Sequence, residues 1–343
     1  MIQVLLKGGL GNQMFSYAYA LKVSRVHGNE KICLNDAFLQ YAPDNRKVAL
    51  ENYELAEDTE ILPSWPHPRT IVKTLKFIVA LCKAKGFGTI CSKIYKFLLI
   101  KQKNDKLKYV NITRFATFVD KLKKRVFDGD NQSAENTEEK NKKNGIYLDG
   151  QQSLQVVKST SKDKYVWGFF QNVSIVEGME AELRKRFNER VEASEANKQM
   201  LEEIKSCNGV CLHIRRGDYF SPQYINTHAV CDERYYAEAV SQAKEMIENP
   251  VFFVFSNDHE SLEWIKQNYS FPPVDIRYVD LANPDYEELR LMKACKHFII
   301  SNSTFSWWAA VLSEESSSKM VWAPKVWVKG SPCTLNMDSW RTL

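Results

Sequence analysis

The stretch "GVCLHIRRGDY", residues 209–219, decides how the C-terminal half of this chain folds. It begins with an apolar run, which is typical of a strand buried on both faces of a parallel sheet. The run ends abruptly in two arginines, and an acid follows two residues later. Because ligands of open parallel sheets bind beyond the carboxyl ends of the strands, this charged end predicts a binding site.

The two arginines face opposite sides of the chain if the alternation of the strand continues past its end. His213 and Arg215 then share one side, and Arg216 takes the other. A guanidinium is a planar, permanently charged fork of donors, so Arg215 is suited to a phosphate. The alternative, on spacing alone, is a structural ion pair between an arginine and Asp218 that closes the strand.

Strands and helices alternate from residue 209 almost to the end of the chain. The expected strands are 209–214, 251–256, 275–280, 297–301 and 320–324. The expected helices between them are 234–248, 260–268, 285–295 and 304–313. Continuous apolar strands that alternate with helices predict a parallel sheet covered on both faces.

The N-terminus has the same order of elements, with an expected strand at 2–6, a glycine loop at 7–13 and a helix at 14–28. Gly9 and Gly11 permit close approach of the backbone to a ligand. The loop is not a dinucleotide-binding G-x-G-x-x-G motif, since Met14 stands at its third glycine position. Asn12 is expected to cap the helix or to line the site.

Two further strand ends carry small polar residues. Asn302, Ser303 and Thr304 stand where a strand passes into a helix, and free N–H groups at a helix N-terminus can bind a phosphate. The alternative for them is an ordinary helix cap. After the strand at 251–256, Asn257 is expected to cap the next helix, and Asp258 is a candidate for the ligand cleft.

Composition sets the broad class. The chain has 343 residues, 44% of them hydrophobic, which favours two globular domains. The net charge of +5 is mild, and the lysines at 70–108 are not interleaved with aromatics, so nucleic acid is not an expected partner. Eight scattered cysteines indicate a reduced, cytoplasmic protein. The start of the chain does not read as a signal peptide, and no run reaches the length of a membrane span.

Two segments depart from the alternating pattern. Residues 63–125 are rich in lysine and apolar residues and predict a helical insert, whose lysines are compatible with a peripheral contact at the inner face of the membrane. Residues 128–145 are polar and predict a mobile loop or a disordered insert. The acids Asp128 and Asp130 in that loop are interpreted as a chance match to a metal site.

Five motifs, in this order, resemble one family. They are "GGLGNQMF", "GFFQN", "HIRRGDY", "FSND" and "LMKACKHFIISNSTFSWWAA". Together they resemble bacterial alpha-1,2-fucosyltransferases, glycosyltransferase family 11, over residues 1–28 and 165–325. Residues 60–150 carry none of these motifs.

The resemblance implies a GT-B-like α/β fold, in which two Rossmann-type domains face a cleft. An N-terminal acceptor-side domain is expected at 1–205 and a domain that binds GDP-fucose at 206–343. The implied reaction is an inverting transfer of L-fucose from GDP-beta-L-fucose to the 2-hydroxyl of a terminal galactose, without a metal or other cofactor. The acceptor would be a galactose-terminated oligosaccharide or a lipid-linked glycan.

The resemblance also suggests roles for residues. Arg215, with His213 beside it, would hold the donor diphosphate, and Glu288 would bind the guanine edge, where the family more often has Asp. Asn12 would line the sugar side. The full set expected to bind the donor is Gly9, Gly11, Arg215, Arg216, Asp258, Glu288, Asn302, Ser303 and Thr304.

An inverting displacement calls for a base at the acceptor hydroxyl, and Asp218 is the nominee. Its alternative role is to hold an arginine in place. Two other functions compete with galactoside fucosylation. One is a related fucosyltransferase that acts on protein, and the other is a nucleotide-sugar-binding protein without catalysis.

Overall fold

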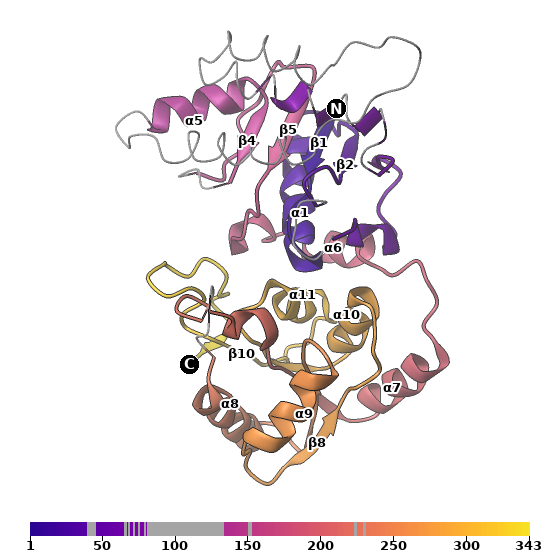
Figure 1. The fold of residues 1–343 in the computed structure, drawn as a ribbon, viewed down its shortest axis with the longest axis vertical. Coiled ribbons are helices and arrows are strands. Elements are labelled where there is room, and N and C mark those ends of the chain that lie inside the picture. The colour runs from indigo at the N-terminus through magenta and orange to yellow at the C-terminus, as the bar shows by residue number, and fades with distance from the viewer. Residues whose placement is uncertain are drawn as a thin grey trace. The chain divides into compact units, whose positions relative to one another are not determined.

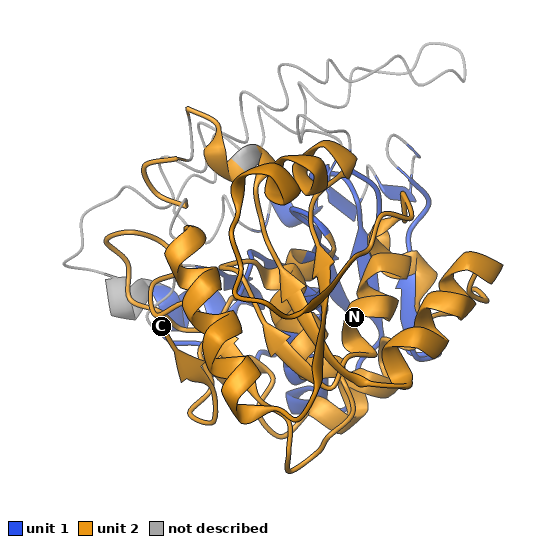
Figure 2. Ribbon diagram, turned by 90° about the horizontal axis from the view of Figure 1, so that it is seen from below, with its two compact units in different colours: residues 1–9, 13–48, 56–170 blue, residues 10–12, 49–55, 171–343 orange. Residues whose placement is uncertain are grey.

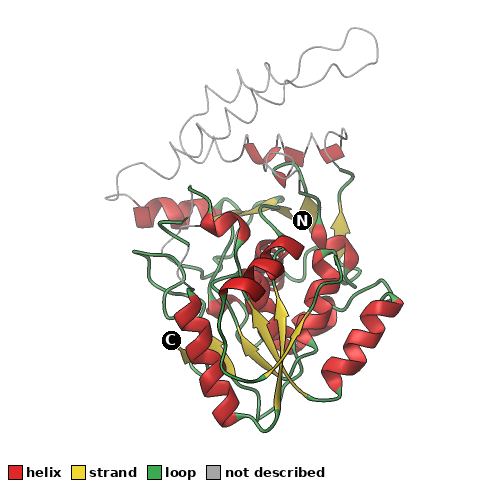
Figure 3. Cartoon of the chain, turned by 60° about the horizontal axis from the view of Figure 1, so that its bottom comes forward, coloured by secondary structure: helices red, strands yellow, loops and turns green. Residues whose placement is uncertain are grey.

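A computed structural model of the protein describes most of the chain (Figure 3). The described residues are 1–39, 46–64, 67, 69–70, 73–74, 76–78, 80, 134–149, 153–222, 225–228 and 231–343, without the side chains of 134–137 and 218. Most of the lysine-rich segment predicted at 63–125 therefore lies outside the described residues. Those described between 69 and 80 are helical, as predicted.

The chain divides into two compact units (Figure 2). The first comprises residues 1–9, 13–48 and 56–170, and the second comprises 10–12, 49–55 and 171–343. The long segment of the second unit starts at 171, whereas the sequence predicted a boundary at 205/206. The reason is that helices α6 (Glu180–Arg186) and α7 (Glu195–Lys205) pack on helices of the second unit.

The first unit holds a parallel sheet with the strand order β3-β2-β1-β5-β4. Its strands are β1 (Ile2–Leu5), β2 (Ile32–Asn35), β3 (Thr59–Ile61), β4 (Ile146–Leu148) and β5 (Lys164–Trp167). Ile2 of the central strand lies opposite Ile32 on one side and Lys164 on the other. All residues of β1, β2, β4 and β5 are buried, as expected of parallel strands with both faces covered.

Helix α1 (Leu10–Val26) follows β1 and confirms the predicted strand and helix, but it begins four residues earlier than predicted. Gly11 and Asn12 therefore lie in its first turn, and Gly9, not Asn12, is its N-cap residue. Met14, Ala18 and Leu21, which share one face of this helix, are all buried. Gln13 fastens the loop, because its side-chain amide donates to the carbonyls of Gly8 and Lys47 at 3.1 and 3.0 Å. The hydrogen bond to Lys47 holds the start of α1 against a segment more than thirty residues away in the sequence.

The polar segment 128–145 was expected to lack structure, and this prediction was wrong for its second half. Residues Ala134–Lys143 form helix α5. The Lys142 ammonium is buried and pairs with Glu138 at 2.6 Å, and it also donates to the Ser153 carbonyl at 2.7 Å. A buried charge is tolerated only with such partners, which composition alone does not reveal.

The second unit holds a parallel sheet with the order β11-β10-β9-β6-β7-β8. Its strands are β6 (Asn208–His213), β7 (Pro250–Phe255), β8 (Asp275–Tyr278), β9 (His297–Ile299), β10 (Val321–Ala323) and β11 (Arg341–Thr342). The connecting helices are α8 (Glu233–Met246), α9 (His259–Asn268), α10 (Asp285–Lys293) and α11 (Thr304–Leu312). Each predicted strand and helix of this half is confirmed, which gives the expected pair of α/β units with parallel sheets.

The helices cover both faces of this sheet (Figure 1). Helices α8 and α9 lie on one face, and α10 and α11 on the other, as right-handed crossovers require for this strand order. Trp307 and Trp308 of α11 are fully buried in the core. Short 3-10 turns complete the unit: η2 (Ala49–Asn52), η4 (Val173–Ile175) and η5 (Gly217–Phe220).

Every helix among the described residues is too short or too polar to traverse a lipid bilayer.

Candidate active site at the switch point of the second sheet

The chain changes direction across the second sheet at strand β6. From β6 it proceeds to β7 and β8 on one side and then returns to β9 on the other. In open parallel sheets, such a topological switch point opens a crevice at the carboxyl ends of the two central strands. His213 ends β6, and Ser301 follows β9, so the predicted motifs meet at this point.

His213 is buried at the end of β6. Its Nδ1 lies 2.9 Å from the Ser301 hydroxyl, and its ring centre lies 6.1 Å from that of Phe305. Burial, with a contribution from the Arg215 charge, lowers the pKa of His213 to about 3. The imidazole is therefore neutral at physiological pH, and it can orient neighbours by hydrogen bonding without adding charge.

The side chains of Arg215 and Arg216 have different neighbours, as expected if they point to opposite sides of the chain. Arg215 lies over the ring of Tyr219, with its guanidinium carbon 5.2 Å from the ring centre. The Tyr219 hydroxyl in turn donates to the carbonyl of Asn302 at 3.1 Å. Arg215 is thereby tied, through one tyrosine, to the residues that follow β9.

Arg216 lies between two aromatic rings. Its guanidinium carbon is 3.2 Å from the ring centre of Trp264 and 4.5 Å from that of Phe220. A weakly hydrated guanidinium is stabilised by such rings. The predicted pairing of Arg216 with Asp218 stays a prediction, because the Asp218 side chain lies outside the description. Arg216 accordingly anchors the turn that carries Arg215.

The turn after the arginines is also held from β7. The Asn257 side chain accepts the N–H of Arg216 at 2.8 Å. Gly217 has φ +44°, and a Cβ there would lie 3.1 Å from the Asn257 amide nitrogen. The left-handed backbone conformation favours glycine, and a Cβ would also require the Asn257 amide to shift slightly. The side chain of Asp218, in the same turn, is outside the description, and its role as a base stays a prediction.

The predicted cap of α9 was off by one residue. Asp258, not Asn257, is the N-cap, and its carboxylate accepts the N–H of Ser261 at 2.7 Å. Asn257 is engaged by Arg216 instead. Asp258 therefore has a structural task at the carboxyl end of β7, beside its predicted role toward the donor.

The three polar residues after β9 have distinct contacts. Asn302 donates from its side-chain amide to the carbonyls of His228 and Trp327, at 2.9 and 2.8 Å. Both of its N–H donors are thus used by the fold. Ser303 caps α11 by accepting the N–H of Phe305 at 3.3 Å. Thr304 donates its hydroxyl to the Asn12 side chain at 3.2 Å.

Gly11 and Asn12 group with the second unit and lie against the start of α11. A Cβ on Gly11 would be 2.7 Å from the Thr304 carbonyl carbon, and the indole N–H of Trp308 donates to the Gly11 carbonyl at 2.9 Å. Asn12 also accepts from the Gln171 side chain at 2.7 Å. Gln171 had no predicted role, although its place in "GFFQN" was the available signal.

Gly9 does not share this environment. It belongs to the first unit, where a Cβ would lie 3.1 Å from a guanidinium nitrogen of Arg46. The two glycines thus allow different close contacts. The missing side chain of Gly11 lets α11 approach, and that of Gly9 lets the Arg46 side chain approach.

The carboxyl group of Glu288, on α10, has a raised pKa. Burial raises its pKa to about 8, with smaller contributions from the charges of Asp285 and Asp280. The carboxyl group is therefore largely protonated at neutral pH. A perturbed acid at the ligand-binding edge of a sheet is typical of a functional group.

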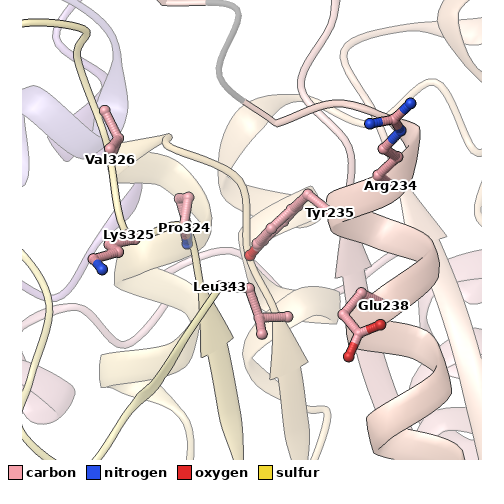
Figure 4. A pocket seen from close by; sticks show the side chains of 7 residues that line it. All are labelled: Arg234, Tyr235, Glu238, Pro324, Lys325, Val326 and Leu343. Carbon is pink, nitrogen blue, oxygen red and sulfur yellow. The ribbon is translucent and has the colours of Figure 1, made fainter.

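A hollow of about 470 Å³ opens elsewhere in the second unit, beside α8 and the end of β10 (Figure 4). It is lined by Arg234, Tyr235, Glu238, Pro324, Lys325, Val326 and Leu343. None of the predicted site residues whose side chains are described lines it. The switch point therefore remains the candidate site.

Two solved structures of transferases are similar to this chain. The fucosyltransferase NodZ from Bradyrhizobium has a TM-score of 0.45 and 12% identity, with 93% of this chain and 95% of that chain covered. The Escherichia coli ADP-heptose LPS heptosyltransferase II has a TM-score of 0.39 and 12% identity, with 100% and 89% covered.

Curated relatives are similar in sequence. An alpha-1,2-colitosyltransferase of Escherichia coli is 34% identical over 47% of this chain, and the chain spans about half, 54%, of that relative. The Escherichia coli O-antigen biosynthesis glycosyltransferase WbnK is 25% identical over 98% of this chain and 99% of its own length. Human galactoside alpha-(1,2)-fucosyltransferase 1 is 34% identical over 30% of this chain and 28% of its own.

The family model described as glycosyl transferase family 11 matches residues 97–329, which include β6, β9 and the switch point between them. Because the match spans more than half of the chain, the protein belongs to glycosyl transferase family 11.

Proposed function

We propose that the protein transfers L-fucose from GDP-beta-L-fucose to the 2-hydroxyl of a terminal galactose, with inversion and without a metal. One observation carries the proposal: Arg215 and the N-terminus of α11 follow the two strands that form the switch point. The names of two relatives, an alpha-1,2-colitosyltransferase and a galactoside alpha-(1,2)-fucosyltransferase, support the linkage.

The chemistry of the leaving group explains why this pairing suits the reaction. As the bond to fucose breaks, negative charge develops on the diphosphate of GDP. The permanent charge of Arg215 would stabilise that charge, together with N–H groups of the first turn of α11 other than that of Phe305, which Ser303 accepts. Fixed donors of this kind contribute without reorganising at the moment of reaction, which is the task a metal ion performs in other transferases.

His213 would take part as a neutral ring. Its hydrogen bond with Ser301 fixes the ring plane, and its low pKa keeps positive charge away from Arg215. We therefore assign the cationic role to Arg215 and an orienting role to His213. Asn12 would line the sugar side from the position where Thr304 and Gln171 hold it.

Glu288 would bind the guanine edge. Guanine presents two adjacent N–H donors, which an ionised carboxylate accepts as a pair. Because the Glu288 pKa is raised to about 8 in the protein alone, donor binding would release a proton below that pH. Asp218 would serve as the base for the acceptor hydroxyl.

The test is a transfer assay with GDP-fucose and an array of galactosides and peptides, in the presence of a chelator. We expect fucosylation of a terminal galactose at its 2-hydroxyl, and loss of turnover in Arg215→Ala. The proposal fails if folded protein modifies no galactoside, or if it modifies only peptides. GDP-colitose is included as a second donor because the name of one relative refers to that sugar.

A further inference from the structure

A partly exposed aromatic ring, that of Phe169, lies at the carboxyl ends of the strands of the first unit. Phe169 lies just after β5, while its neighbour Phe170 is buried in the core. A cation and a carboxylate flank Phe169, from the ends of the two strands that pair with β5, which are β1 and β4. This trio belongs to neither the donor set nor the second sheet.

The two residues that flank Phe169 have backbone φ angles that residues other than glycine rarely adopt. Gly168 has φ +156°, and a Cβ there would lie 2.0 Å from the Cβ of Asp149. Phe170 has φ +51°, which is rare for a bulky side chain, and its ring stacks on Tyr19 at 4.1 Å. Ser16 holds the turn by donating to the Gly168 carbonyl at 2.7 Å. Strain that the surroundings enforce in this way clusters at functional sites.

Lys7 follows β1 and supplies the positively charged group beside Phe169. Its ammonium nitrogen is 4.2 Å from the ring centre of Phe169 and 5.7 Å from that of Trp167. Both rings lie within the distance at which an aromatic face attracts an ammonium group. Because an ammonium carries three N–H donors, it can serve a ligand in addition to a partner in the protein.

Asp149 follows β4 and brings the acceptor. Its Oδ2 accepts the backbone N–H of Phe169 at 2.7 Å. An ionised carboxylate offers about four lone-pair sites, so this one hydrogen bond leaves acceptor capacity. An aromatic surface, a fixed donor and a fixed acceptor therefore meet at the carboxyl ends of three adjacent strands.

We propose that Phe169, Lys7 and Asp149 form a carbohydrate subsite that holds the acceptor glycan. The chemistry matches a pyranose: its C–H face packs on an aromatic ring, while its hydroxyls accept from an ammonium and donate to a carboxylate. The proposal rests on the fucosyl transfer proposed above, because it assigns this sugar the role of acceptor. It makes Lys7 and Asp149 determinants of acceptor affinity with no part in binding GDP.

The test compares Lys7→Met with a matched control. Methionine keeps a flexible stem over the two rings and removes the charged donor. Lys31→Met is the control. Lys31 precedes β2, so it lies at the amino ends of the strands of the same sheet, and it pairs with Glu60 at 3.4 Å. Phe169→Leu is a second variant, which removes the ring and keeps apolar bulk. Thermal melts establish that all three are folded.

For Lys7→Met we expect the acceptor KM to rise about tenfold, the effect of losing one charge-assisted hydrogen bond. The KM for GDP-fucose and the affinity for GDP are expected to stay at wild-type values in both Lys7→Met and Phe169→Leu. An acceptor KM equal to that of Lys31→Met, or an equal loss of GDP affinity, would overturn the proposal.

Binding of glycans without transfer separates this inference from the reaction. Saturation-transfer NMR with galactosides reports the ring contacts in the absence of a donor. Lost sugar contacts in Lys7→Met and Phe169→Leu support the subsite even if no fucose is transferred. Transfer by wild type with unchanged acceptor KM in both variants would uphold the reaction and reject the subsite.

Discussion

Replacing Gly11 by alanine tests the contact between the glycine loop and α11. The added methyl carbon would lie 2.6 Å from the Thr304 hydroxyl, 2.7 Å from its carbonyl carbon and 2.9 Å from the backbone nitrogen of Phe305. Two of these atoms are backbone, so rotation of a side chain cannot relieve the clash. The start of α11 or of α1 must therefore move by several tenths of an ångström.

The magnitude follows from two opposing effects. Overpacking of this kind costs about 1–3 kcal/mol, whereas alanine is favoured over glycine in a helix by about 1 kcal/mol. We expect the free energy of unfolding to fall by about 1–2 kcal/mol in urea titrations. Because the 3.2 Å hydrogen bond from Thr304 to Asn12 would be stretched, kcat/KM should fall at least about tenfold.

The matched control is Gly28→Ala. Gly28 has φ +77°, and a Cβ there meets no atom within 4 Å. We expect a loss of about 1–2 kcal/mol from backbone strain alone, with unchanged kcat/KM. If Gly11→Ala kept wild-type stability and activity, the close approach of the loop to α11 would be refuted.

Variants at three further positions probe the donor side. Trp264→Ala removes the ring under Arg216, and we expect GDP affinity to fall about three- to tenfold, with Trp264→Phe retaining most of it; unchanged affinity in the alanine variant would argue against an anchoring role. Arg216→Ala should resemble Trp264→Ala and cost less activity than Arg215→Ala. Because the Glu288 pKa is raised above its unfolded value to about 8, the stabilisation linked to it is fully present below about pH 4.5 and is lost as pH rises toward 8. Glu288→Gln should flatten the fall in the free energy of unfolding between pH 5 and 8, and an unaltered slope would contradict the raised pKa.

The second sheet could be predicted almost entirely from the sequence. Asn208–His213 and Pro250–Phe255 are long apolar strands, and helices such as α8 and α9 carry one buried and one polar face, so period and length agree there. Strands of the first unit, such as Thr59–Ile61 and Ile146–Leu148, are only three residues long. Short segments like these carry too little pattern to be recognised without their neighbours in the sheet.

The candidate site was predictable in its parts and not in its contacts. Residue types and strand ends brought His213, Arg215 and the serine-rich turn together. The choice between Asn257 and Asp258 as the cap depended on the N–H of Arg216, which only the folded chain brings near. The contact of Gly11 with Thr304 joins positions almost three hundred residues apart, so no local pattern reports it.

The most direct test of the central claim is calorimetric titration of GDP and of guanosine into wild type and Arg215→Ala. If Arg215 holds the diphosphate, the Kd for GDP should rise about 10- to 100-fold, as loss of a charge-assisted, two-pronged contact requires. The Kd for guanosine should stay the same. An unchanged Kd for GDP, or an equal loss for both ligands, would contradict the account.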